Sequence, residues 1–189
     1  MGFQIHDIRK VKPAAGRLYF LDANIWLHLL AETPPARAQP YLDFFASLTA
    51  LSDGSEPVIV ATSLLVAEAF NAHLGAGFRL YQKENPGSGA ANLKRDYRPT
   101  QHYKDQRNNF LYQFKAYEGY VRIVPDDVER TNIWEMLNRI PSIADFNDFY
   151  YARFCRNNDY TIVTDDGDFK FEGVEILTIN RQLLALQTT

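Results

Sequence analysis

The sequence predicts an α/β fold, a three-layer α/β/α sandwich around a mostly parallel sheet of about five strands. Short apolar runs bounded by turn residues are typical of strands buried on both faces. These runs alternate with segments whose apolar residues recur at helical spacing. The 189 residues contain no internal repeat, so we expect residues 1–189 to form a single domain, with a loop-rich insertion at about 76–107.

The first half of the chain predicts two strands and the helices that follow them. The run RLYFLD at 17–22 and the run PVIVA at 57–61 are the strands, and aromatic and leucine residues at helical spacing predict a helix over 35–51. Thr62 and Ser63 are suited to cap the next helix, TSLLVAEAFNAHL.

We expect Gly75 or Gly77 to end that helix, and the polar segment 83–92, KENPGSGAAN, to be a mobile loop. In the predicted helix before Pro141, Ile133, Trp134 and Leu137 supply an apolar stripe. The remaining expected elements are helices at 101–118, 126–140 and 143–156, strands at 121–124, 160–164 and 174–179, and a short leucine-rich helix at the C-terminus.

Composition narrows the class of protein. The single cysteine, Cys155, excludes an intrachain disulfide framework and a cysteine-built zinc site. No apolar run approaches the roughly 18 residues of a membrane span, and the first sixteen residues lack the apolar stretch of a signal peptide. We therefore expect a cytoplasmic protein with no membrane partner.

The formal net charge of −3 is unevenly distributed. Residues 79–107 hold seven Lys or Arg and three Asp or Glu, a net charge of +4, so the rest of the chain carries −7. Within the basic segment, Tyr81, Tyr97 and Tyr103 alternate with the cations, a combination suited to RNA phosphates and bases. A merely solvated loop is the alternative for this segment.

Acidic residues follow several predicted strands. Asp22 ends the first strand, Glu68 lies in the helix after the second, and a run of acids in VTDDGDF follows the fourth. Asp145 and Asp148, three residues apart, share a face of the preceding helix. Ligands of open parallel sheets bind beyond the carboxyl ends of the strands, so we expect these acids to share a site.

A pocket of carboxylates is costly because like charges repel and lose their solvation. A divalent cation offsets this cost, and Asp and Glu without His or Cys favour Mg²⁺ or Mn²⁺ over zinc. Each acid also has a structural alternative, since Asp22 and Asp165 suit turns and Asp145 suits the first turn of a helix.

Five segments, LDANIWL, TSLLVAEAF, ADFNDFYYARFC, TIVTDDGDF and GVEILTIN, resemble the PIN-domain ribonucleases. The most specific detail is that Asp148 precedes Thr164 by sixteen residues, and that Thr164 begins the signature TDDGDF. The resemblance covers roughly 17–74 and 119–186, and leaves the basic insertion outside it.

The resemblance implies roles for particular residues. Asp22, Glu68, Asp148 and Asp166 would be the catalytic, metal-binding acids, with Asp168 as a further metal-binding acid at the edge. Asn24 and Thr164 would be their hydrogen-bonding neighbours. The sequence departs from the family where Phe149, Tyr150 and Tyr151 replace an alanine-rich core, and where Asp145 and Asp165 add acids.

The resemblance also implies an activity and partners. The expected function is a metal-dependent endoribonuclease that hydrolyses single-stranded or exposed RNA with Mg²⁺ or Mn²⁺ and without a side-chain nucleophile. Many family members of this size are toxins of toxin-antitoxin modules, so a small antitoxin protein and a homodimer are expected. The candidate RNA contacts are Lys94, Arg95 and Arg98, with His102 as a further one.

Other functions compete with this one. The main alternative is a catalytically silent PIN-like module that binds RNA or a protein. A haloacid-dehalogenase-type phosphatase needs a second acid that Asp22-Ala23-Asn24 lacks. A receiver domain needs paired acids after the first strand and an acceptor after the third, where the chain offers only VRIVPDD.

Overall fold

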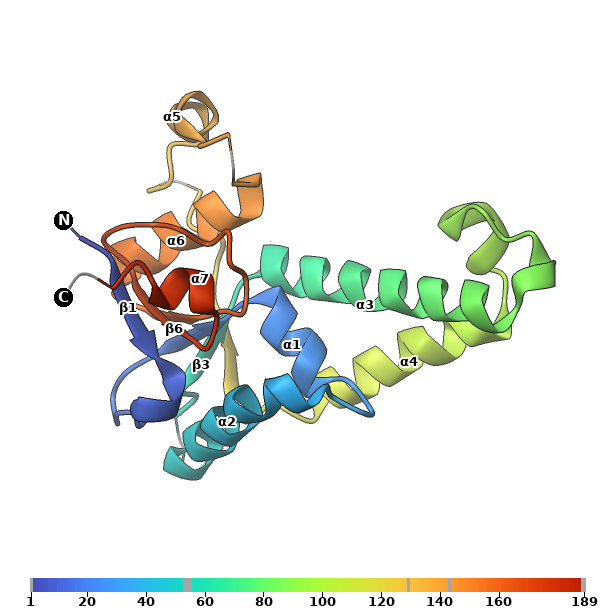
Figure 1. Ribbon diagram of the computed structural model, residues 1–189, viewed down its shortest axis with the longest axis horizontal. Helices are drawn as coiled ribbons and strands as arrows, with labels where there is room; N and C mark the ends of the chain where they lie inside the picture. The colour runs from blue at the N-terminus through green and yellow to red at the C-terminus, as the bar shows by residue number, and fades with distance from the viewer. Residues whose placement is uncertain (1, 53–55, 129, 143, 188–189) are drawn as a thin grey trace.

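A single parallel sheet of six strands organises the protein, in the order β1-β6-β5-β2-β3-β4 (Figure 1). The computed structural model describes residues 2–52, 56–128, 130–142 and 144–187. Helices flank this sheet, so the predicted three-layer α/β sandwich is confirmed. The strands are β1 (Gln4–Asp7), β2 (Tyr19–Leu21), β3 (Ile59–Ala61), β4 (Val121–Ile123), β5 (Thr161–Val163) and β6 (Glu175–Thr178).

One strand was not expected from the sequence. β1 pairs only with β6, and its four residues QIHD are exposed and buried in alternation. The strand has one apolar residue, Ile5, and therefore no apolar run to indicate it in the sequence. The other five strands all fall within the predicted segments.

One helix, α3, is longer than the pattern suggested, whereas α2, α4 and α5 are shorter than the expected segments 35–51, 101–118 and 126–140. They are α1 (Ala23–Leu29), α2 (Gln39–Leu51), α3 (Ser63–Glu84), α4 (Gln101–Lys115), α5 (Ile133–Arg139), α6 (Phe146–Asn158) and α7 (Arg181–Leu184), with short helical turns at Ile8–Lys10, Ala36–Ala38, Pro86–Ser88 and Leu93–Tyr97. Residue 129, within the helix expected at 126–140, and residue 143, the first of the helix expected at 143–156, lie outside the described residues. In the part of the chain that the structure describes, no helix has both the length and the apolar character to cross a membrane.

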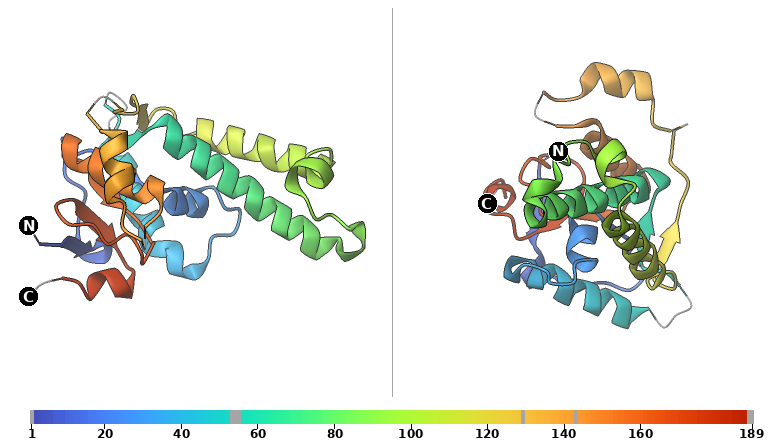
Figure 2. Two further views of the ribbon diagram at one scale, coloured as in Figure 1. Left: turned by 90° about the horizontal axis from the view of Figure 1, so that it is seen from above. Right: turned by 90° about the vertical axis from the view of Figure 1, so that its right-hand side faces the viewer.

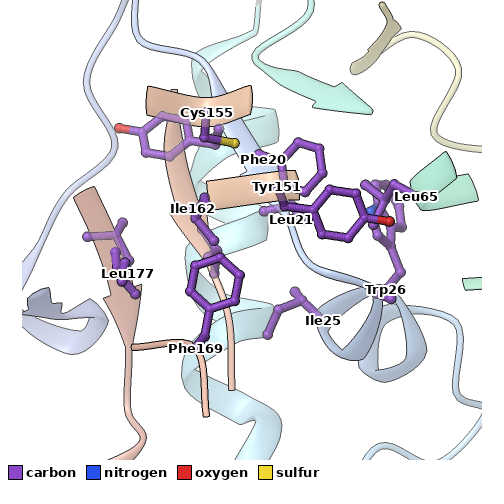
Figure 3. Close-up of a cluster of buried hydrophobic side chains, with 14 of the residues drawn as sticks. Phe20, Leu21, Ile25, Trp26, Leu65, Tyr151, Cys155, Ile162, Phe169 and Leu177 are labelled. Atoms are coloured by element: carbon purple, nitrogen blue, oxygen red, sulfur yellow. The ribbon is translucent and has the colours of Figure 1, made fainter. Parts of the chain in front are cut away.

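The central strand β2 holds the layers together because its side chains alternate between the two faces. Tyr19 packs edge-on against Phe44 of α2, with ring centroids 5.5 Å apart. Phe20 faces the other way, onto Tyr151 and Phe154 of α6 at 4.9 and 5.9 Å. Figure 3 shows Phe20 and Tyr151 side by side in this core. The helices α2 and α6 therefore cover opposite faces of the sheet.

A two-helix arm is the most distinctive feature of the overall shape. The distal part of α3 and the start of α4 extend together away from the sheet, at the end of the molecule opposite the two termini (Figures 1 and 2). Helix covers 76–84 and 101–107, so loop is confined to the turn segment 85–100 between them. The arm is thus a packed helical hairpin.

The expectation that Gly75 or Gly77 ends α3 is wrong, because the helix continues to Glu84. A Cβ atom on Gly77 would lie 2.8 Å from the hydroxyl oxygen of Tyr97 and 3.0 Å from Cγ of Gln106. Gly77 is therefore placed inside the helix for close packing of α4 and the turn segment.

The expected apolar stripe of α5 is also wrong in part. Trp134 is 79% exposed and Leu137 is 49% exposed, whereas Met136 is fully buried. The buried face of this short helix is set by Ile133 and Met136, three residues apart, which pack against the core.

Candidate active site at the ends of the central strands

The candidate site lies where the sheet order reverses direction. The chain passes from β2 to β3 on one side and later places β5 on the other side of β2. Beyond the carboxyl ends of such strands, the following segments diverge and leave a crevice. Asp22 follows β2, Thr62 follows β3 and Thr164 follows β5, so three loops with polar residues meet there.

Asp22 is the most buried of the predicted site acids, with 4% of its surface exposed. Its Oδ1 accepts a 2.6 Å hydrogen bond from the backbone N–H of Ala23 and so caps α1. Its Oδ2 accepts hydrogen bonds from Asn24 Nδ2 at 2.7 Å and from the Thr164 hydroxyl at 2.6 Å. The predicted neighbours Asn24 and Thr164 thus contact this carboxylate directly.

Thr164 connects Asp22 to the acidic loop after β5. Its hydroxyl oxygen accepts hydrogen bonds from the backbone N–H of Asp166 at 3.0 Å and from Asn24 Nδ2 at 3.2 Å. The amide oxygen of Asn24 in turn accepts from the N–H of Asp165 at 3.1 Å. One side-chain network therefore sets the position of Asp166 relative to Asp22.

Glu68 reaches the site from α3, and two residues that sequence reasoning missed hold it. Its Oε2 accepts 2.7 Å hydrogen bonds from Asn147 Nδ2 and from the Tyr151 hydroxyl, both on α6. Tyr151 stood out in the sequence only as a departure from an alanine-rich pattern. Its place four residues after Asn147, on one helical face, was the signal that could have identified the pair.

Asp148 lies in the first turn of α6. Its backbone N–H donates to Oδ1 of Asp145 at 2.9 Å, so Asp145 is the N-cap of this helix. The capping alternative for Asp145 is therefore the one that the structure shows, and the Asp148 carboxyl group is free to join the other acids.

Burial and the charges of neighbouring acids raise the pKa of two of the four acids, Asp22 and Asp148. Burial, together with the charges of Glu68 and Asp166, raises the pKa of Asp22 to about 6, against the opposing effect of its Thr164 hydrogen bond. Burial and the charges of Asp145, Asp22, Asp166 and Glu68 raise the pKa of Asp148 to about 8. Four acids from four segments of the chain therefore form one electrostatically coupled group.

The donor atoms of this group suit a hard cation. Carboxylate oxygens are the ligands that Mg²⁺ and Mn²⁺ prefer, and a cation would offset both the burial of charge and the mutual repulsion that raise these pKa values. Among the described residues, no group of three or more His, Cys, Asp or Glu side chains lies close enough together to hold a metal ion. A Mg²⁺ ion at this site would therefore need water molecules as ligands beside these acids, as Mg²⁺ sites usually have.

Two further acids of the loop point elsewhere. Asp165 is 3.0 Å from the hydroxyl of Tyr41 and lies 3.6 Å from Nε2 of His28, on the side of the loop that packs against α2. Asp168 has a largely exposed carboxylate 3.6 Å from Nζ of Lys170, while its backbone N–H donates to Oδ1 of Asp166. The role of Asp168 as a metal-binding acid at the edge of the site stays a prediction.

The candidate RNA contacts lie far from the acids, in the turn at the tip of the arm. Lys94, Arg95 and Arg98 are all exposed. Arg95 differs from the other two because its Nε is 2.6 Å from Oδ1 of Asp96. His102 is held inside the tip, with Nδ1 2.8 Å from the Tyr97 hydroxyl.

Comparison with known proteins adds little to this geometry. No family model and no curated protein matches the chain. A search of solved structures found similarity to the crystal structure of PAE2754 from Pyrobaculum aerophilum, with 16% identity, 96% coverage of each chain and a TM-score of 0.44. This similarity is too low to carry an inference, so the functional argument rests on the site itself.

Proposed function

We propose that this protein is a PIN-like, metal-dependent endoribonuclease that hydrolyses phosphodiester bonds of single-stranded or exposed RNA. The observation that carries the proposal is the burial of Asp22 and Asp148 beside the like charges of Glu68 and Asp166, which together raise the pKa of both carboxyl groups. Strong pKa perturbation by burial and like charge is typical of functional sites. We also propose a cytoplasmic location, in keeping with the free, buried thiol of Cys155.

The four acids would hold Mg²⁺ or Mn²⁺. A divalent cation there would offset the negative charge of the phosphodiester and lower the pKa of an attacking water. Asn24 and Thr164 orient the Asp22 carboxylate, and Asn147 and Tyr151 orient that of Glu68. Fixed ligands of this kind reduce the reorganisation needed when the substrate binds.

We infer that water is the nucleophile, in keeping with the burial of Thr164 and Cys155, two side chains near the acids that could otherwise attack. Thr164 is fully buried and donates its proton to Asp22. Cys155 is fully buried as well, and burial raises the pKa of its thiol, which keeps it protonated. The antitoxin and the homodimer stay predictions that rest on the family resemblance.

Cleavage of a fluorescent RNA pool with and without Mn²⁺ tests the proposal. We expect wild-type protein to cut only with the metal, and Asp22→Asn and Asp148→Asn each to reduce the rate by at least a hundredfold. Asp159→Asn is the matched control, because Asp159 is exposed at the opposite end of α6 from Asp148. Activity close to that of wild type in both site variants would refute the assignment, and RNA binding without cleavage by wild type would favour the silent binding module.

A further inference from the structure

The arm separates the basic residues from the acidic site. α3 is a continuous helix of 22 residues, about 33 Å long at 1.5 Å per residue. It carries Glu68 near its first turns and Arg79 and Lys83 near its end, about 16 and 22 Å further along the axis. Figure 2 shows the tip of the arm well clear of the sheet and of both termini.

The tip is an ordered structure with its own small core. Tyr97 is fully buried, with ring centroids 5.1 Å from Phe78, 5.3 Å from Tyr81 and 5.4 Å from Tyr103. The side chain of Asn92 accepts from the backbone of the tip turn, and Thr100 caps α4. The solvated-loop alternative therefore does not describe this segment.

Packing in this core leaves the aromatic rings little free surface for stacking on bases. Stacking on a nucleic-acid base needs an exposed ring face. Tyr97 has none, and Tyr81 and Tyr103 are partly buried against it. The expectation that Tyr97 stacks on RNA is wrong, because packing inside the tip already uses its faces.

The tip presents charged side chains to solvent. All seven of its Lys and Arg side chains are exposed, and Arg95 is the one that forms an ion pair, with Asp96, among the described residues. Six cations therefore remain unpaired in the described structure, namely Arg79, Lys83, Lys94, Arg98, Lys104 and Arg107. On the helices they lie in same-face pairs, four residues apart on α3 and three apart on α4.

We propose that the arm tip is a sequence-independent docking site for the phosphate backbone of a long RNA, and that it acts at a distance from the acidic site. The inference rests on the proposed function for the identity of the polyanion. Exposed cations around a core that buries Tyr97 supply phosphate contacts, which bind without regard to sequence and weaken with salt. An RNA that reaches both sites gains affinity that a very short RNA cannot.

Binding measured without metal tests this inference separately from cleavage. Fluorescence anisotropy in EDTA would follow uridine oligomers of thirty and of four nucleotides across a series of salt concentrations. The arm variant combines Lys94→Gln, Arg98→Gln and Lys104→Gln. The control combines Lys10→Gln, Lys12→Gln and Arg181→Gln, which remove the same charge from exposed positions outside the arm.

We expect the slope of log K against log salt for the longer RNA to become shallower by about 2 in the arm variant, from roughly 0.7 per lost single-strand phosphate contact. The control variant should keep the wild-type slope, and the slope for the four-nucleotide RNA should change less in the arm variant, because this RNA offers fewer phosphates to the tip. Equal slopes in the two variants would overturn the proposal. Polyglutamate that binds as tightly as RNA would also overturn the proposal. An arm variant whose only effect is a loss of self-association would overturn it as well. Failure of cleavage alone would leave these binding results unchanged and would count against the proposed function instead.

Discussion

Asp22 shows how one residue combines structural and chemical roles. It caps α1, accepts from Asn24 and Thr164, and has a pKa raised to about 6 by burial and by neighbouring acids. Three hydrogen bonds stabilise its charged form, while burial and like charge oppose that form. The hydrogen bonds therefore orient the carboxylate, and a bound cation would further stabilise its charged form.

Tyr151 permits a test of the residues that orient the acids. Tyr151→Phe removes the hydroxyl that donates to Glu68 and keeps the buried ring. We expect Mn²⁺ affinity to fall about tenfold, as is common when a neighbour that orients a ligand is lost. Isothermal titration with Mn²⁺ measures this.

Tyr150→Phe is the matched control for that experiment. Tyr150 is equally buried in α6, but its hydroxyl accepts from the backbone N–H of Asp127 rather than contacting Glu68. It should lower stability by about 1 kcal/mol and leave Mn²⁺ affinity unchanged. Equal Mn²⁺ affinities in the two variants would remove Tyr151 from the site.

Helix α3 is the element that links the two proposed sites. It supplies Glu68 to the acidic group at one end and supports the basic tip at the other. Its continuity through two glycines depends on tertiary packing, since glycine inside a helix costs roughly 0.5–1 kcal/mol relative to alanine.

The two glycines predict opposite responses to substitution by alanine. Gly77→Ala would place Cβ 2.8 Å from the Tyr97 hydroxyl, so we expect loss of about 1–3 kcal/mol through overpacking of the tip. Gly75→Ala meets only an Arg79 nitrogen at 3.7 Å, so the better helix propensity should stabilise by about 0.5–1 kcal/mol. Hydrogen exchange over 77–107, with thermal unfolding, measures both effects. If both substitutions raised the free energy of unfolding, the packing of the tip would be able to rearrange at little cost, contrary to this prediction.

At the scale of the whole molecule, the coupled acids make stability depend on pH. Asp148 has a folded-state pKa of about 8 and Asp22 one of about 6, both above the ordinary value of 3.8. Between about pH 4 and these values the folded state binds protons that the unfolded state has released. The free energy of unfolding of the metal-free protein should therefore fall as pH rises through this window.

Thermal unfolding in EDTA between pH 5 and 8 measures this prediction. We expect Tm to fall by several degrees, since 1 kcal/mol corresponds to about 2–4 °C for a chain of this size. Excess Mn²⁺ at pH 8 should restore Tm, because a ligand of the folded state stabilises it. Asp148→Asn should raise the metal-free Tm at pH 8 and weaken the response to Mn²⁺. A Tm that is independent of pH in the wild type would contradict the coupling of the acids.

The sequence by itself determined the α/β class, five of the six strands and the candidate acids. Unbroken apolar runs indicate buried strands because both faces of a parallel sheet are covered. Asp22 and Asp166 could be found because strand ends and their loops are local features of the chain. β1 was missed because four alternating residues at an edge carry too little local information.

Only the tertiary structure decided which residues face one another. Asn147 and Tyr151 became partners of Glu68 because the fold brings α6 to this residue of α3, across sequence separations of 79 and 83. The same kind of long-range contact buries Tyr97, assigns Asp165 to Tyr41 rather than to the acids, and carries α3 through Gly77. Local propensity could not decide these outcomes, because each depends on what another segment of the chain places beside the residue.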